Sequence, residues 1–161
     1  MSDVKNTHIP ATASPLVSEE NLFATMQQLD AAIADILEAG AAKEATYQDK
    51  AALMRRIREL DTEIQLVEAG AVMNVEGVGK EAFGILPSGK RVSLTNDAAR
   101  DAFRRSFSAD LRTEQTQAQS RVNQLDVDLA KANDGYTAKQ EAFSGIRAKA
   151  NLQAAILTYL T

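Results

Sequence analysis

The amino-acid sequence predicts a mainly α-helical protein, in which a long antiparallel helical hairpin of coiled-coil type carries a small three-stranded β-meander between its helices. Two observations predict this fold class. Apolar residues recur at alternating steps of three and four in two long stretches, which is the spacing of a coiled-coil seam. Between them, the stretch 71–95 is the only one whose pattern indicates β-structure.

Composition sets limits on both fold and function. The chain has 161 residues, about one domain, and only 5% are aromatic, so thin helical packing fits better than a thick globular core. With 18 Lys and Arg against 22 Asp and Glu, its mild acidity argues against a surface shaped throughout for nucleic acid. Cysteine is absent and His8 is the only histidine, so we expect no disulfide, no metal site within one copy and no cofactor.

Residues 1–17 contain Pro10 and Pro15 and show no apolar period. They predict a flexible or extended N-terminal arm, with packing along a neighbouring subunit as the alternative. No apolar run approaches the roughly 18 residues that cross a bilayer, and the start of the chain lacks the pattern of a secretory signal. We therefore expect a soluble cytoplasmic protein without membrane contact.

The first predicted helix spans residues 18–70, with Ser18 as its cap, Val17 and Leu22 spaced as a hydrophobic staple, and Gly70 as its stop. Its apolar residues form two series: Leu22, Met26, Leu29, Ile33 and Ile36, then Leu53, Ile57, Leu60, Ile64 and Val67. The second series is one residue out of phase with the first. The seam therefore slips, or the helix bends near Gly40, or Gly40 splits it into two helices.

The predicted meander occupies residues 71–95. Strands at 71–76, 82–86 and 91–94 are joined by turns at 77–80 and 87–90, where proline and glycine suit a tight β-turn. A sheet this small is marginal alone. We therefore expect its apolar side chains to cover the helix ends or to join a sheet from another subunit: Val72, Val75, Phe83, Ile85, Val92 and Leu94.

The second predicted helix spans residues 96–161, capped by Thr95 or Asn96, with Phe103 and Phe107 placed to pack under the strands. Further along, one unbroken series contains Val122, Leu125, Leu129, Ala132, Tyr136, Phe143, Ile146, Ala150, Leu157 and Leu160, with Lys139 and Gln153 as polar exceptions. Because this period survives residues 133–135, a continuous helix is favoured over a turn into a separate terminal helix.

If the two helices leave and return to the meander, Leu22 lies near Phe143 and Ile36 near Leu129. Two helices with a narrow seam leave much apolar and alanine surface uncovered. We therefore expect the chain to associate with copies of itself, as a dimer or higher oligomer, into a helical bundle. The residues expected on this seam are Leu22, Met26, Leu29, Ile33, Ile36, Leu53, Ile57, Leu60, Val122, Leu125, Leu129, Tyr136, Phe143 and Ile146.

The glycines do not form a known phosphate loop. Around Gly79 and Lys80, a Walker A loop would need glycine where Asn74 stands and a hydroxyl residue where Glu81 stands. No catalytic triad can be assembled either, since cysteine, paired histidines and a glycine elbow around serine are all missing. We expect no catalytic residues, with a carboxylate-dependent enzyme as the remaining enzymatic alternative.

Basic residues gather in the middle of the chain. Residues 50–112 hold eleven Lys and Arg against nine Asp and Glu, and the expected register brings Arg55–Arg58 opposite residues 107–110. The candidate anion site consists of Arg55, Arg56, Arg58, Lys90, Arg91, Arg100, Arg104 and Arg105. Guanidinium groups suit phosphate or carboxylate, but here they alternate with acids with which they could simply pair.

The sequence thus predicts a non-enzymatic oligomeric protein with a structural, assembly or adaptor role, whose partners are itself and another protein. The alternative is a binder of a nucleotide or nucleic acid through the central arginines. In outline, helix, small β-region and returning helix resemble the prefoldin-like hairpin, although the third strand departs from its simplest form. This resemblance implies a fold and gives function little support.

Overall fold

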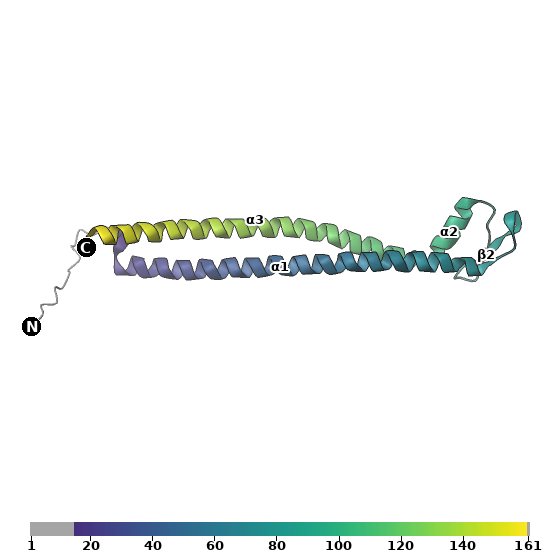
Figure 1. The fold of residues 1–161 in the computed structure, drawn as a ribbon, viewed down its shortest axis with the longest axis horizontal. Coiled ribbons are helices and arrows are strands. Elements are labelled where there is room, and N and C mark those ends of the chain that lie inside the picture. The colour runs from purple at the N-terminus through teal and green to yellow at the C-terminus, as the bar shows by residue number, and fades with distance from the viewer. Residues whose placement is uncertain (1–14, 161) are drawn as a thin grey trace, which may run out of the picture. The chain divides into compact units, whose positions relative to one another are not determined.

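The structure is a computed structural model that describes residues 15–160, and it is mainly helical with a small three-stranded antiparallel sheet (Figure 1). The N-terminal arm predicted at 1–17 lies outside the described residues except for its last three. In chain order, with η for a 3-10 helix, the elements are η1 (Pro15–Val17), α1 (Glu19–Gly70), η2 (Ala71–Asn74), β1 (Val75–Glu76), η3 (Gly79–Glu81), β2 (Phe83–Ile85), β3 (Arg91–Ser93), α2 (Asp97–Phe107) and α3 (Ala109–Leu160).

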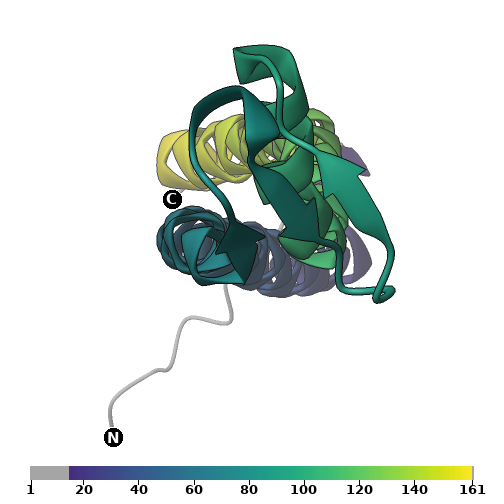
Figure 2. The same cartoon turned by 90° about the vertical axis from the view of Figure 1, so that its right-hand side faces the viewer.

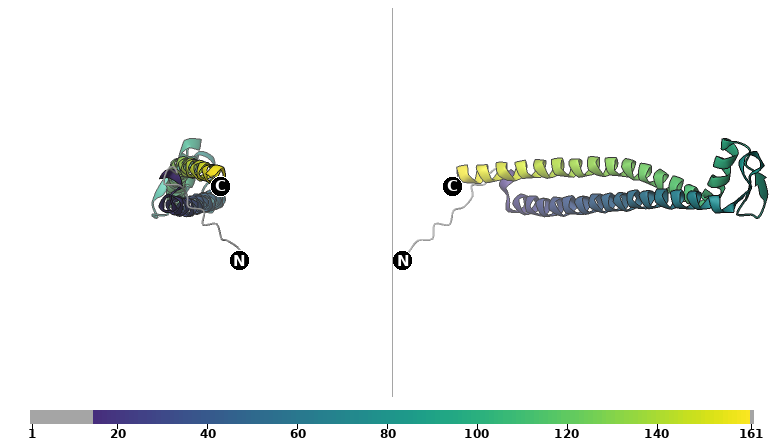
Figure 3. Two further views of the ribbon diagram at one scale, coloured as in Figure 1. Left: turned by 90° about the vertical axis from the view of Figure 1, so that its left-hand side faces the viewer. Right: turned by 45° about the vertical axis from the view of Figure 1, so that its right-hand side comes forward.

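The chain forms two compact units, each of which contains part of α1 and part of α3. The helical unit comprises Met1–Ala45 and Leu129–Thr161, and the sheet unit comprises Thr46–Asp128. The right-hand view in Figure 3 shows α1 beside α3 within each unit. Hydrogen bonds join the two helices inside both units, for example from Lys139 Nζ to the Asp35 carbonyl and from Arg56 Nε to Glu114.

The helix α1 begins as the sequence predicts. The backbone N–H of Asn21 donates to Ser18 Oγ at 3.3 Å, and Val17 is buried next to Leu22. The helix then continues without interruption through Gly40. A side-chain carbon at Gly40 would lie 3.7 Å from the Tyr136 ring, so this glycine lies against α3 rather than at a helix end.

The seam of α1 differs from the predicted one. The covered positions in the helical unit are Leu22, Thr25, Leu29, Ala32, Ile36, Ala39 and Lys43, and the same steps continue in the sheet unit to Leu53, Ile57, Leu60, Ile64 and Val67. Met26 and Ile33 were expected on this seam but are exposed, because Thr25 and Ala32 occupy their places. With these two residues in the series the steps are regular, and no slip of the seam is present.

In α3 the covered positions follow the predicted series and include its two polar exceptions, but Leu160, which was expected in the series, is exposed. Gln153 is 2% exposed, and its Nε2 donates to the Leu16 carbonyl at 2.7 Å. Lys139 reaches the carbonyl of Asp35 at 3.3 Å. Both side chains therefore bind backbone oxygens of the N-terminal segment or α1, which explains polar residues on an apolar seam. The helix also continues through Gly135.

The register of the helices is shifted from the expected one. Gln153 lies at Asn21, where a residue near Phe143 was expected, so the shift is about ten residues. The cause is the second helix, which was predicted to be continuous from residue 96 but is divided into α2 and α3 at Ser108. Since the returning helix begins at Ala109, the seam residues of α1 lie beside residues of α3 that come later in the chain than the expected partners.

The sheet has the order β1-β2-β3, and its strands are shorter than predicted (Figure 2). Residues 71–74 were expected to be part of the first strand but form η2. At Gly70 the backbone remains right-handed helical (φ -65°), so the chain tightens into a 3-10 turn instead of leaving the helix through a left-handed glycine. The Pro87 turn is present as predicted, with Gly89 at φ 80° and its N–H bound to the Leu86 carbonyl.

The core of the sheet unit includes a cluster of Ala71, Ala82, Leu94 and Phe103. Phe103 packs edge to face on Phe107, with ring centroids 5.1 Å apart. Phe107 also packs against this cluster, so both rings lie where the sequence predicts. The Phe103 ring also lies against Gly84, where a side-chain carbon would come within 2.4 Å of it. Of the expected sheet residues, Val72 and Ile85 are exposed instead of covering a helix end.

Candidate functional site

The predicted arginine cluster is distributed over three elements of the sheet unit. Arg55, Arg56 and Arg58 lie on α1, Lys90 and Arg91 lie at the β2–β3 turn, and Arg100, Arg104 and Arg105 lie on α2. The shifted register pairs Arg56 with Glu114, whereas Glu68 of α1 lies beside Ser108. Residues 56 and 68 are about 18 Å apart along a helix. The expected gathering of Arg55–Arg58 with the arginines near residue 107 is therefore wrong.

Several of these cations are paired with carboxylates of the same chain. Arg56 binds Glu114 at 2.9 Å and Glu63 at 2.8 Å, and hydrogen bonds to these two acids raise the pKa of Arg56 above its ordinary value. Arg100 pairs with Asp97 at 3.3 Å and Arg104 with Asp101, both one helical turn away. Arg91 lies over the Phe83 ring, 3.0 Å from its centroid. Such pairing is typical of structural arginines on a solvated surface.

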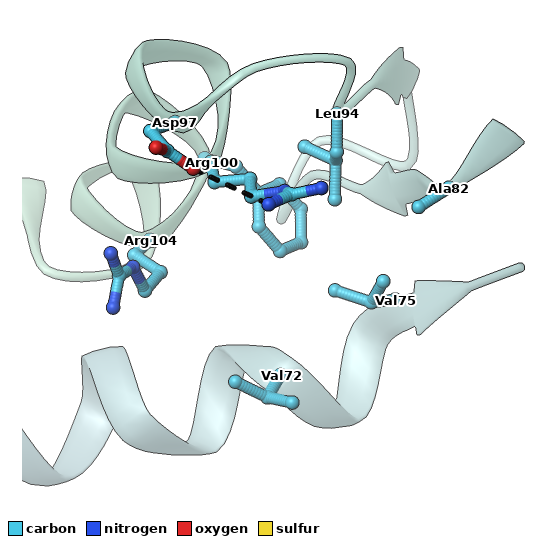
Figure 4. A pocket seen from close by; sticks show the side chains of 8 residues that line it. Val72, Val75, Ala82, Leu94, Asp97, Arg100 and Arg104 are labelled. Carbon is cyan, nitrogen blue, oxygen red and sulfur yellow. Dashed lines mark hydrogen bonds and ion pairs between the residues drawn. The ribbon is translucent and has the colours of Figure 1, made fainter. Parts of the chain in front are cut away.

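Arg100 and Arg104 do meet at one feature, a pocket between α2 and the segment from η2 to β1 (Figure 4). Its volume is about 410 Å³. Its apolar wall consists of Val72, Val75, Ala82, Leu94 and Phe103, and Asp97, Arg100 and Arg104 complete the lining. Figure 4 shows the two arginines on the α2 side, across from Val72 and Val75. This pocket, hereafter the head pocket, can accept an apolar group that lies next to an anion.

A second cluster fixes α1 to the junction of α2 and α3. Ser108 is 0% exposed; its Oγ donates to Glu68 Oε1 at 2.5 Å, and Arg112 Nη2 donates to the same oxygen at 2.7 Å. The Ser108 hydrogen bond is the main cause of the lowered pKa of Glu68, and Arg112 adds to it. These groups bind one another, so we assign them a structural role.

The third feature is an apolar row on the outer side of α1 in the helical unit. Phe23, Met26, Ile33 and Leu37 are 61, 63, 46 and 69% exposed. Their spacing places them on one stripe of the helix, next to the seam but not on it. We call these four residues the α1 outer face. Met26 and Ile33 were expected on the seam, whereas Phe23 and Leu37 were not predicted as interface residues.

Neither the head pocket nor Ser108 was identified from the sequence. Ser108 followed by Asp110 is a helix-start signal, and it could have indicated the break before α3. The head pocket had no such signal, because its walls come from segments whose contact depends on the tertiary fold.

Among residues 15–160, no three histidine, aspartate or glutamate side chains are grouped so that they could hold a metal ion. Within the same part of the chain, no helix has an apolar stretch long enough to cross a membrane. Comparisons of this chain with protein-family models, with curated proteins and with solved structures found no match.

Proposed function

We propose that this chain is a non-enzymatic structural or assembly protein that associates with copies of itself through the α1 outer face. The observation that carries the proposal is the row of Phe23, Met26, Ile33 and Leu37, four large apolar side chains that are all about half exposed or more. Single exposed apolar residues are ordinary on protein surfaces, but several on one helix face mark an interaction surface. Asp30 lies in the same row, between Met26 and Ile33.

The energetics favour coverage of this stripe. Full burial of one such side chain contributes about 1.5–3 kcal/mol relative to exposure, so four of them on each chain can offset the entropic cost of association. Short side chains surround the stripe, since Ala31, Ala34 and Ala41 are exposed on α1 and Ala24 is half-buried. Alanines let another helix approach closely, as in a coiled-coil hairpin that is completed into a larger bundle.

A matched pair of substitutions tests this proposal. Leu37 and Leu66 both lie on α1 and are 69% and 68% exposed, but only Leu37 belongs to the outer face. We expect Leu37→Lys to lower the average mass in light scattering at micromolar concentration, and Leu66→Lys to leave it unchanged. Equal masses for wild type and Leu37→Lys would refute the proposed surface, provided that circular dichroism shows the same helix content.

The head pocket gives the protein a second surface, suited to an adaptor role. Its apolar wall is open to solvent at Val72, which is 60% exposed. We expect it to bind an apolar anionic dye such as anilinonaphthalene sulfonate, with a rise in fluorescence. Val72→Asp should reduce this rise, and Val78→Asp should not, because Val78 is exposed but lies outside the pocket lining. Equal fluorescence in the two variants would exclude the pocket as the binding site.

A further inference from the structure

We propose that the α1 outer face of one copy packs antiparallel against the outer side of α3 in a second copy, with Asp30 at Lys149 and Ile33 at Gly145. This inference rests on the proposed self-association and names the surface that completes it. The α3 outer face consists of Gly135, Ala138, Ala142, Gly145, Lys149 and Leu152, which follow one another at steps of three and four. All six lie within the helical unit, on α3.

Charge disfavours the simplest alternative, in which two copies of α1 pair with each other. Residues 15–45 contain six acids and a single base, Lys43. Two such segments would place like charges in contact. Residues 129–160 of α3 contain four bases and two acids. The acidic side of α1 is therefore complementary to α3 and not to itself.

The glycines of α3 supply an independent observation. Gly135 and Gly145 lie inside a helix, where glycine costs about 1 kcal/mol relative to alanine. A side-chain carbon at either position would meet no atom within 4 Å, so packing inside the described chain does not require glycine there. A gap on a helix surface allows a large side chain of another helix to enter. On the α1 outer face, Ile33 is such a side chain, and the proposed register places it at Gly145.

One register satisfies both shape and charge. With Ile33 at Gly145, Leu37 lies at Ala142 and Asp30 at Lys149, so two large residues meet small ones and the acid meets the base. Met26 lies at Leu152, which makes an apolar contact. A shift of one heptad would place Phe23 at Lys149 and lose the ion pair. The proposed register is therefore the one in which side-chain size and charge are both complementary.

The two outer faces lie on opposite sides of the α1–α3 pair in the helical unit. On α1, Met26 follows the seam residue Thr25, whereas on α3 Gly145 precedes the seam residue Ile146. The two helices run in opposite directions, so a step forward along α1 and a step back along α3 turn in the same direction when viewed along the pair. Because the two seams face each other, this equal rotation places the two outer faces on opposite sides of the pair. Each copy then presents one face to the copy before it and the other to the copy after it. Such a contact is heterologous and forms open chains or rings rather than symmetric dimers.

Complementary blocking variants test this arrangement in the full-length chain. Leu37→Lys places a charge on the α1 face where an apolar side chain meets Ala142, and Gly145→Glu places a large charged side chain on the α3 face where Ile33 packs. Each variant alone has lost one of its two faces, so we expect each to be monomeric in light scattering. An equimolar mixture retains one intact pair of faces and should form a heterodimer that grows no further.

The controls separate this inference from the proposal on which it rests. Gln140→Glu changes an exposed residue on the opposite flank of α3 and should leave association unchanged. If wild type and all variants are monomeric, the proposed self-association itself is wrong. If wild type associates and Leu37→Lys does not, but Gly145→Glu associates normally or the mixture remains monomeric, self-association stands and the α1–α3 contact is refuted.

Discussion

The sheet unit and the helical unit bury different kinds of side chain. In the sheet unit the buried apolar residues include Leu60, Leu94 and Phe103, whereas in the described part of the helical unit they are Val17 and Leu129. The most deeply covered positions of the helical unit also include two polar residues, Thr25 and Gln153. The sheet unit thus has fully buried large apolar side chains, whereas in the helical unit most of the large apolar seam residues are only half-buried. The proposed contact with a second copy therefore involves the helical unit, which carries the α1 outer face.

The largest expected effect is the loss of the sheet unit's own core. Phe103 is buried among Ala71, Ala82 and Leu94, so Phe103→Ala should lower the free energy of unfolding by about 3–5 kcal/mol. Hydrogen exchange should show the loss in residues 71–107, with α1 and α3 of the helical unit still protected. Val78→Ala, at an exposed site, should change stability by less than about 0.5 kcal/mol. Comparable losses in the two variants would contradict the assigned core.

A smaller effect is expected at the junction that fixes α1 to Ser108. Glu68→Gln weakens a charged hydrogen-bond acceptor for Ser108 and Arg112 and should cost about 1–3 kcal/mol at neutral pH. The pKa of Glu68 lies below its ordinary value of 4.5, so this stabilisation is present above that pH and is lost as the pH falls through the lowered pKa.

The test is denaturant unfolding as a function of pH. The unfolding free energies of wild type and Glu68→Gln should converge as the pH falls below 4.5, whereas the exposed Glu81→Gln should match wild type throughout. A difference between wild type and Glu68→Gln that does not change with pH would show that the carboxylate charge has no role in the contact.

The smallest effect is a gain in the helical unit. Gly40→Ala adds a methyl group at ordinary contact distance, 3.7 Å, from the Tyr136 ring and removes the conformational freedom of a glycine inside α1. We expect stability to rise by about 0.5–1 kcal/mol, measured by urea unfolding. The reverse change at the exposed neighbour, Ala41→Gly, should lower it by a similar amount. A destabilised Gly40→Ala variant would mean that Tyr136 packs more tightly on α1 than the structure shows.

The heptad spacing of α3 could be predicted from the sequence because its apolar residues mark the covered side. The polar exceptions Lys139 and Gln153 fit this side because they donate to backbone carbonyls. The same reasoning failed on α1. It assigned the seam to the largest apolar residues, Met26 and Ile33, when the smaller Thr25 and Ala32 lie against α3. Side-chain size distinguishes covered from exposed positions only where a helix has a single apolar face.

The candidate site was harder to predict because it depends on register. A break of one residue at Ser108 shifts α3 along α1, which separates Arg56 from the arginines of α2 and brings Glu68 to Ser108. Neither propensity nor apolar period reports such a shift, since the series on α3 is unchanged by it. The head pocket also depends on tertiary contacts, as Phe103 can pack on the sheet only where Gly84 leaves room.

The most direct test of the central claim is the mass of the unmodified protein in solution. If another copy covers the α1 outer face as proposed, sedimentation equilibrium across the micromolar range should give a concentration-dependent average mass above the 17.4 kDa of one chain. A constant mass of 17.4 kDa at every concentration would contradict the account, since Phe23, Met26, Ile33 and Leu37 would then remain exposed to water.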